Sequence, residues 1–381
     1  MVEGGTVERR AIEGGVICSA PGYAGTYWGH RLETCSPPWR AGVEVWLRRW
    51  RDEHGAGAPA EAMLAWEQED DLDAPMFPPG VRVERLHALQ LAGTPPIVSV
   101  DADVRRLGLG DWPALMELAT EVIGHSLGGD AGGYLRWHWG RARALFEQGR
   151  SERWGAFSEG RLVATAGVVW DAYEGRYQDV LTHEGMRRRG YARALVTACA
   201  RSRREAAPDA PLTIVARADS PAEGLYRSLG FARRSTCLEI AARAPRTGET
   251  IRALTRDFES GSLPTSEWGH REHLSVASQV LRETGLELRP ALVWMRETLQ
   301  RYLVAQGIGR DRYHETITRG WLELVRLQLL LRPHDSLSDA VLGVTLQLAD
   351  KRRLLAHWSR DVLAGGEARV RWCPPDLAPL A

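Results

Sequence analysis

The residues best suited to do chemistry form a glycine- and arginine-containing loop at the start of a predicted helix. Residues 177–194 read YQDVLTHEGMRRRGYARA, in which a strand leads through a tight turn into Arg187-x-x-Gly190-x-Ala192. Small residues at Gly190 and Ala192 let a ligand come close to the backbone. The first amides of a helix lack intrahelical partners and lie at the positive end of its dipole. We therefore predict an anion site suited to a pyrophosphate, with added positive charge from Arg187, Arg188, Arg189 and Arg193.

A tyrosine on a short predicted helix is the second candidate group. Residues 218–231 read ADSPAEGLYRSLGF, in which a strand has just ended at Ala216, a helix presents Tyr226, and a turn at Gly230 leads into another strand. A tyrosine hydroxyl held at such a place can protonate a leaving thiolate.

The elements that must position these two segments alternate between strands and helices. Apolar spacing predicts helices at 111–124, 137–148, 190–206 and 221–228. It predicts strands at 97–100, 154–157, 162–170, 177–182, 211–216 and 231–240. Alternation of this kind favours an α/β layer with mixed strand directions.

Composition divides the chain into three predicted domains. Residues 1–96 are rich in Trp, Gly and Pro, contain one predicted helix at 41–54, and are expected to pack on the middle domain as an N-terminal extension. The α/β pattern occupies residues 97–242. Residues 248–381 are nearly all helical, with helices predicted at 270–282, 290–306, 314–331 and 339–356, which favours a compact all-α bundle.

Together, the loop and the tyrosine helix resemble the acyl-CoA-binding motif and the following helix of the GNAT superfamily of N-acyltransferases. WGAFSEGRLVATAGVV at 154–169 is similar to the central hairpin of that superfamily, and GRYQDVLTHEGMRRRG at 175–190 resembles a bacterial branch of it. The resemblance extends over about residues 100–240. GYAGTYWGHRL at 22–32 and the PPW at 37–39 also resemble the N-terminal extension of that branch. The resemblance implies a GNAT-like mixed sheet flanked by helices for the middle domain.

The resemblance also implies roles for individual residues. The backbone amides of Val180, Leu181 and Thr182 should line pantetheine and polarise the thioester carbonyl. The pyrophosphate should be held by the loop and the first helical turn, which comprise Arg188, Arg189, Gly190, Tyr191, Ala192 and Arg193.

Three further positions follow from the same resemblance. Tyr226 matches the general acid of the superfamily. Ser220 stands where the superfamily often has a pantetheine-contacting Asn. The carboxylate base that some members carry before the tyrosine helix is absent, since Val215 and Ala216 occupy that strand. This leaves Asp179, Glu184 or Asp219 to deprotonate the amine through water, unless the amine arrives neutral.

These inferences favour an acetyl-CoA-dependent N-acetyltransferase that acts on a small amine by direct attack on the thioester. Two alternatives remain open. One is an acyl-CoA-binding regulatory protein without catalytic activity, because a fold does not guarantee an activity. The other is a bifunctional protein whose helical domain binds a metal. The sequence does not identify the acceptor amine.

The metal hypothesis rests on three histidines and a glutamate of the helical region. His270 and His273 lie three residues apart on one predicted helix, and His314 and Glu315 open a later helix. Such a set could hold a divalent cation inside a bundle, although its spacing matches no named metal motif. The alternatives are that these side chains cap helices and satisfy buried polar contacts, or that they line a ligand pocket without a metal.

Composition excludes several classes of protein. Lys+Arg and Asp+Glu each number 49, so the chain has no global basic field for nucleic acid. No stretch approaches the ~18 apolar residues of a membrane helix, and the first residues lack the apolar core of a signal peptide. The five cysteines are scattered and form no C-x-x-C pair, which disfavours disulfides and a cysteine zinc site. We expect a cytoplasmic protein with a small-molecule amine acceptor and neither nucleic-acid nor membrane partners; a homodimer is compatible with the fold.

Overall fold

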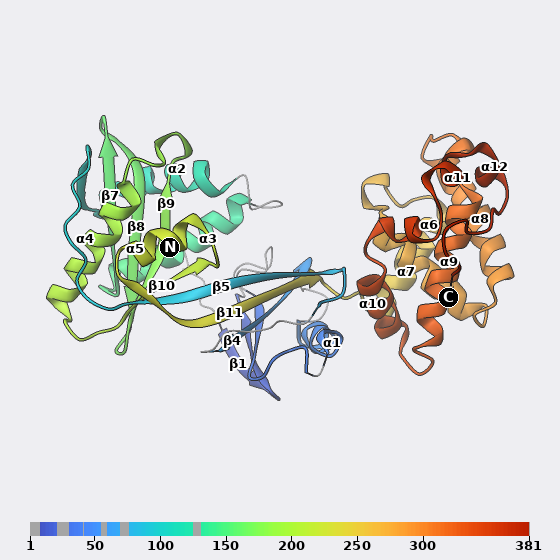
Figure 1. Cartoon of the computed structure of the whole chain (residues 1–381), viewed down its shortest axis with the longest axis horizontal. Coiled ribbons are helices and arrows are strands. Elements are labelled where there is room, and N and C mark those ends of the chain that lie inside the picture. Colours follow the sequence, from blue (N-terminus) through green and yellow to red (C-terminus); the bar gives the residue numbers. More distant parts are fainter. Residues whose placement is uncertain are drawn as a thin grey trace. The chain divides into compact units, whose positions relative to one another are not determined.

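The computed structural model of the chain contains two compact units (Figure 1). It describes residues 8–20, 30–40, 42–54, 59–68, 76–124 and 131–380. Unit 1 takes in residues 83–241 and the described segments 8–20, 30–40 and 59–68, whereas unit 2 takes in residues 242–380, 42–54 and 76–82. The first 96 residues therefore contribute to both units, and the division into three domains stays a prediction.

A mixed sheet forms the body of unit 1. Its described strands are β1 (Glu8–Ile12), β2 (Gly15–Ser19), β3 (Arg31–Thr34), β4 (Glu61–Gln68), β5 (Val81–Leu91), β6 (Asp103–Arg106), β7 (Ser151–Ser158), β8 (Arg161–Trp170), β9 (Gly175–Thr182), β10 (Leu212–Arg217) and β11 (Phe231–Arg243). They lie in the order β1-β2-β3-β4-β11-β5-β10-β9-β8-β7-β6. Strands β6 to β9 pair antiparallel, β9 and β10 pair parallel, and β10 and β5 pair antiparallel. The predicted α/β class with mixed strand directions is confirmed.

Helices cover both faces of this sheet. They are α2 (Trp112–Ile123), α3 (Ala131–Glu147), α4 (Tyr191–Ala206) and α5 (Pro221–Ser228), with short 3-10 turns η3 (Leu109–Asp111) and η5 (Glu184–Met186). Val180 of β9 packs in the core that includes α4 and α5, whereas Leu181 packs with α2 and α3. Consecutive strand residues point to opposite faces, so the two pairs of helices lie on opposite sides of β9.

Unit 2 is helical, as predicted. Its described helices are α1 (Val43–His54), α6 (Gly248–Ser260), α7 (His270–Glu283), α8 (Leu288–Ala305), α9 (Glu315–Leu330), α10 (Leu337–Gln347), α11 (Arg360–Ala364) and α12 (Gly366–Val370), with 3-10 turns η6 (Thr265–Glu267), η7 (Arg310–Arg312) and η8 (Lys351–Ala356). Phe258, Leu281 and Val325 of three helices are fully buried in one core, together with Trp358 from the bend between η8 and α11.

The structure corrects several sequence-based predictions. Residues 97–100 are not a strand, because Ile97 is 75% exposed and the edge strand β6 begins at Asp103 instead. The helix predicted over 339–356 ends at Gln347, and Asp350 caps the separate turn η8 through the Arg352 N–H. The helix predicted at 137–148 begins earlier, at residue 131. The predicted N-terminal helix is confirmed as α1, but the strands β1 to β5 around it were not predicted.

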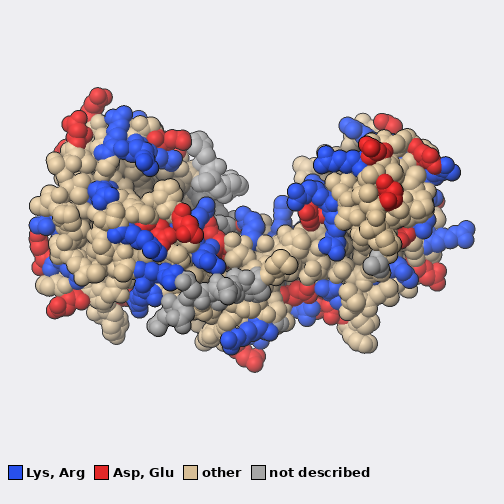
Figure 2. All heavy atoms as spheres, in the orientation of Figure 1, with Lys and Arg blue, Asp and Glu red and all other residues tan. Residues whose placement is uncertain are grey.

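Charges of both signs occur on the face of each unit that the space-filling view shows. Figure 2 shows basic and acidic side chains interspersed over the visible face of each unit, in keeping with the zero net charge. Among the helices of the described residues, none is both long and apolar enough to cross a membrane.

Candidate functional site

The candidate site begins where two parallel strands separate. Strands β9 and β10 pair only at Leu212 with Gly175 and at Thr213 with Arg176, although β9 continues to Thr182. The backbone of β9 beyond Arg176 therefore has an open side along which an extended ligand can add as a further strand. Val180, Leu181 and Thr182, the predicted pantetheine contacts, lie in this open stretch.

A bulge in β9 lies beside the point of separation. The register between β8 and β9 shifts between Thr165 and Gly167, and Asp179, opposite that shift, adopts a left-handed φ of 52°. A bulge re-aims the backbone groups next to it and is frequent at active sites. Here it changes the direction of the amides that follow Asp179.

An ion-pair cluster surrounds Asp179 at this bulge. Its Oδ2 accepts a hydrogen bond from Arg153 Nη2 at 2.5 Å, and its Oδ1 lies 2.8 Å from His138 Nε2. The Arg153 guanidinium is buried and lies over the Trp139 ring, 4.5 Å from its centroid. Burial raises the pKa of Asp179, but Arg153 and His138 outweigh burial and hold that pKa well below its usual range. Such a carboxylate is a weak base, so the geometry favours a positioning role for Asp179 over the predicted role as base.

The predicted anion loop lies at the N-terminus of α4. Gly190 is the N-cap residue with a φ of 86°, and no side chain caps the helix. The first intrahelical bond runs from Ala194 N–H to Gly190 C=O, so the preceding amides point out of the helix end. A Cβ at Gly190 would be strained by its φ and would lie 3.2 Å from Val100 Cγ1. The structure thus brings together the predicted pyrophosphate residues Arg187, Arg188, Arg189, Gly190, Tyr191, Ala192 and Arg193.

The residues of this loop differ in what they can offer a ligand. Arg187, Arg188 and Arg189 are exposed, and Arg188 has a left-handed φ of 67°. The Tyr191 side chain is buried, so Tyr191 contributes its backbone alone. Arg193 Nη2 donates to Ser228 Oγ at 2.7 Å, which joins the start of α4 to the end of α5. The two predicted halves of the site are therefore neighbours.

Helix α5 presents Tyr226 from a well-fixed start. Ser220 caps the helix by accepting from the Glu223 N–H at 3.2 Å and donates to the Arg217 carbonyl at 2.6 Å. These bonds use the Ser220 hydroxyl, and its predicted contact with pantetheine stays a prediction. Tyr226 is 6% exposed, and burial raises its pKa to about 12. Its hydroxyl is therefore protonated at neutral pH, as a general acid requires.

Sequence reasoning missed the residues that anchor α5. Glu223 is buried, with Oε1 lying 2.8 Å from His87 Nδ1 on β5 and Oε2 accepting from the Asp219 N–H at 2.7 Å. This network holds the turn at Asp219, whose φ is 58°, directly before the helix. The Ser220-x-x-Glu223 spacing is typical of a capping box and could have drawn attention to Glu223. No comparable local signal marks His87, His138 or Arg153, whose partners are distant in the sequence.

The alternative carboxylates offer no better base at this site. Glu184 lies in η5 with its side chain 87% exposed and 3.7 Å from Arg187. Asp219 contributes its backbone N–H to the Glu223 network. An acceptor amine that arrives neutral remains compatible with this arrangement.

The predicted metal site is not supported. Among the described residues, no group of three or more His, Cys, Asp or Glu side chains is arranged to hold a metal. His314 caps α9 with Nδ1 and donates from Nε2 to the Leu363 carbonyl, and Glu315 is bound by Arg296 and by the Tyr313 hydroxyl. These two residues satisfy helix ends and polar contacts. His270 and His273 instead line a cavity of the bundle.

The segment that contains this site matches a known protein family. Residues 153–240, which include the β9 bulge, the anion loop and α5, match the family model described as FR47-like protein. This segment is GNAT-related. The predicted resemblance of the middle region to the GNAT superfamily is thereby confirmed over these residues. No curated protein matches the chain.

The chain is also similar to solved structures at low sequence identity. A functionally unknown conserved protein from Staphylococcus epidermidis is 11% identical, with a TM-score of 0.48, and the match covers 64% of this chain and 96% of that one. A GCN5-related N-acetyltransferase from Kribbella flavida is 15% identical (TM-score 0.45; 62% and 90% covered). Another from Sphaerobacter thermophilus is 18% identical (TM-score 0.42; 61% and 81% covered).

Proposed function

We propose that this chain is an acetyl-CoA-dependent N-acetyltransferase that transfers the acyl group to a small amine. The observation that carries the proposal is the opening between β9 and β10 together with the uncapped N-terminus of α4, both within the GNAT-related residues 153–240. An extended pantetheine arm and a pyrophosphate are the chemical groups that these two features fit.

Binding of the co-substrate uses backbone groups at both features. The open side of β9 over Val180, Leu181 and Thr182 binds pantetheine as an added strand. The outward amides at the start of α4 bind the pyrophosphate, and the exposed guanidinium groups of Arg187, Arg188 and Arg189 neutralise its charge. Gly190 supplies the left-handed conformation that this turn requires.

The transfer then needs neither a metal nor a covalent enzyme intermediate. The nitrogen lone pair of the amine attacks the thioester carbonyl carbon, and an amide of β9 after the bulge stabilises the oxyanion that develops. The tetrahedral intermediate collapses, the C–S bond breaks, and the amine nitrogen loses its proton to water. The leaving thiolate takes the Tyr226 proton, so the products are an amide and free CoA.

Two measurements test this function with one protein preparation. Calorimetry should detect acetyl-CoA binding, and a thiol-specific reagent should detect CoA released in the presence of a broad panel of amines. Tyr226→Phe should keep the affinity for acetyl-CoA and lower kcat by about 10²-fold. Binding without turnover for any amine would instead identify an acyl-CoA-binding regulatory protein. Absence of binding would refute both.

A further inference from the structure

Two adjoining cavities of unit 2 have no role in the transfer site. The first has a volume of about 350 Å³ and contains the basic side chains Arg243, Arg271 and Lys351. The second, also about 350 Å³, contains Trp268 and Trp321 and several aliphatic side chains. They share four lining residues, namely Gly269, His270, Leu274 and Lys351. The cavities therefore adjoin each other at these four residues.

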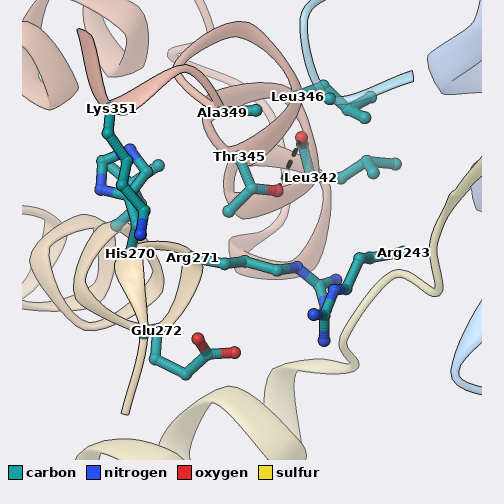
Figure 3. Close-up of a pocket in the computed structure, with 12 residues that line it drawn as sticks. Arg243, His270, Arg271, Glu272, Leu342, Thr345, Leu346, Ala349 and Lys351 are labelled. Carbon is teal, nitrogen blue, oxygen red and sulfur yellow. Dashed lines mark hydrogen bonds between the residues drawn. The ribbon is translucent and has the colours of Figure 1, made fainter. Parts of the chain in front are cut away.

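The first cavity is built to receive an anion. Among the described residues, no carboxylate forms an ion pair with Arg243, Arg271 or Lys351. The acidic residue in its lining, Glu272, is held by Arg246 at 2.8 Å. Figure 3 shows the Arg243 and Arg271 side chains meeting at their guanidinium groups, with Lys351 beside His270. Burial and then the neighbouring positive charges, Arg246 first, lower the pKa of Arg271 to about 10. A bound anion would relieve this repulsion, and two guanidinium groups match the geometry of a carboxylate or phosphate.

The second cavity is built to receive a flat apolar group. Among the described residues that line it, none is acidic, and Lys351 is the charged one. Trp268 is fixed by stacking on Phe258, with ring centroids 4.1 Å apart, and contacts His273 at 4.0 Å. Rigid aromatic walls of this kind favour a planar ligand.

The two histidines that line the second cavity differ in their charge and contacts. Burial lowers the pKa of His273 to about 4, so its ring is neutral at pH 7. No hydrogen bond occupies the His273 ring nitrogens within the part of the chain that the structure describes. His270, which lines both cavities, donates from Nε2 to the Leu348 carbonyl at 2.8 Å. This bond holds the His270 ring in place at the junction of the two linings.

We propose that unit 2 binds a small organic oxyanion, with its carboxylate or phosphate at Arg243, Arg271 and Lys351 and a planar apolar body between Trp268 and Trp321. The combined volume suits a molecule with one or two rings. This binding is independent of the acyl transfer proposed for unit 1, so failure of either leaves the other standing.

The test uses the full chain and the fact that Lys351 is its single lysine. Reductive ¹³C-methylation keeps the positive charge of that side chain and gives it a single lysine signal in NMR spectra. The signal is assigned to Lys351 by its absence from the spectrum of Lys351→Met. Addition of 3-phenylpropionate should shift this signal and give heat in calorimetry. The amine of matched shape, 3-phenylpropylamine, should do neither, because the cavity is cationic. Phenyl phosphate and inorganic phosphate distinguish the head group: the aromatic ester should bind, and the inorganic ion should bind at least tenfold more weakly.

Variants locate the binding. Arg271→Met and Arg243→Met should each weaken 3-phenylpropionate binding by about tenfold, the effect of one charge-assisted contact. Arg243 is exposed, so Arg243→Met should fold and keeps the test valid if Arg271→Met does not. Arg352→Met is the control, since Arg352 adjoins Lys351 in sequence but pairs with Asp350 outside both cavities. Equal binding of the acid and the amine, or unchanged affinity in both arginine variants, would overturn the proposal.

Discussion

Replacement of Arg153 by methionine should disturb the β9 bulge more than any surface change in unit 1. The side chain is 2% exposed and pairs with Asp179 at 2.5 Å, while its guanidinium lies over the Trp139 ring. Methionine fills a similar volume against that ring and removes the charge. The Asp179 carboxylate would then stay in a nearly buried position with His138 as its remaining partner.

The size of the effect follows from this burial. Removal of one partner of a buried ion pair costs about 3–5 kcal/mol of unfolding free energy. Because Asp179 keeps His138 and is 15% exposed, we expect the lower end, about 3 kcal/mol, for Arg153→Met. The double variant Arg153→Met/Asp179→Asn removes both charges, so its loss should be smaller than the sum of the two single losses by about 2 kcal/mol.

Urea denaturation of the four proteins measures this difference, and calorimetry with acetyl-CoA measures its consequence for the site. All three variants should bind acetyl-CoA more weakly, because the pair holds the bulge at Asp179. The exposed pair of Arg143 and Glu147 is the matched control, and its coupling should be below about 0.5 kcal/mol. Additive losses for Arg153 and Asp179, within about 0.5 kcal/mol, would refute the role given to this pair.

Three further predictions concern single residues. Gly190→Ala should weaken acetyl-CoA binding about tenfold in calorimetry, because alanine resists the φ of 86° and its Cβ meets Val100 Cγ1; unchanged affinity would contradict the role of this turn. The folded-state pKa of Asp179 is lowered, so its contribution to stability is present above the unfolded pKa of about 4 and is lost as pH falls below it. The stability gap between the wild type and Asp179→Asn, followed by urea denaturation across pH, should therefore shrink below about pH 4, and a constant gap would contradict the ion pair. The pKa of His273 falls from 6.5 to about 4 on folding, so the unfolding free energy of unit 2 should fall by about 1–3 kcal/mol as the pH drops from 6.5 to 4. Thermal unfolding across this pH range should show the loss in the wild type and not in His273→Phe.

Local patterns predicted the middle of the chain well. Helix α5 has the predicted bounds because Ser220 caps it, Pro221 opens it and Gly230 follows it in a left-handed conformation. The turn at Gly190 was also predictable, since the glycine and the arginines around it are contiguous, whereas its binding of an anion stays a prediction. Its position at the start of α4 follows from the predicted strand that precedes it and the predicted helix that follows it.

Long-range pairing explains what the sequence did not predict. Strand β5 pairs with β10, so that Gln90 lies opposite Thr213, and no local pattern carries that information. The ion pair of Arg153 with Asp179 joins different strands, and this contact changes the interpretation of Asp179 from a base to a positioning group. The run at 97–100 is apolar enough for a strand, yet Ile97 is exposed, which periodicity alone cannot detect.

Hydrogen exchange of the backbone amides of β9 and α4 with saturating acetyl-CoA tests the central claim most directly. Leu181 pairs with Thr165 of β8, so the amides expected to slow in exchange are those of Val180 and Thr182 on β9 and those of residues 191–193 at the uncapped helix end. Unchanged exchange at both segments would contradict the binding mode on which the proposed transfer depends.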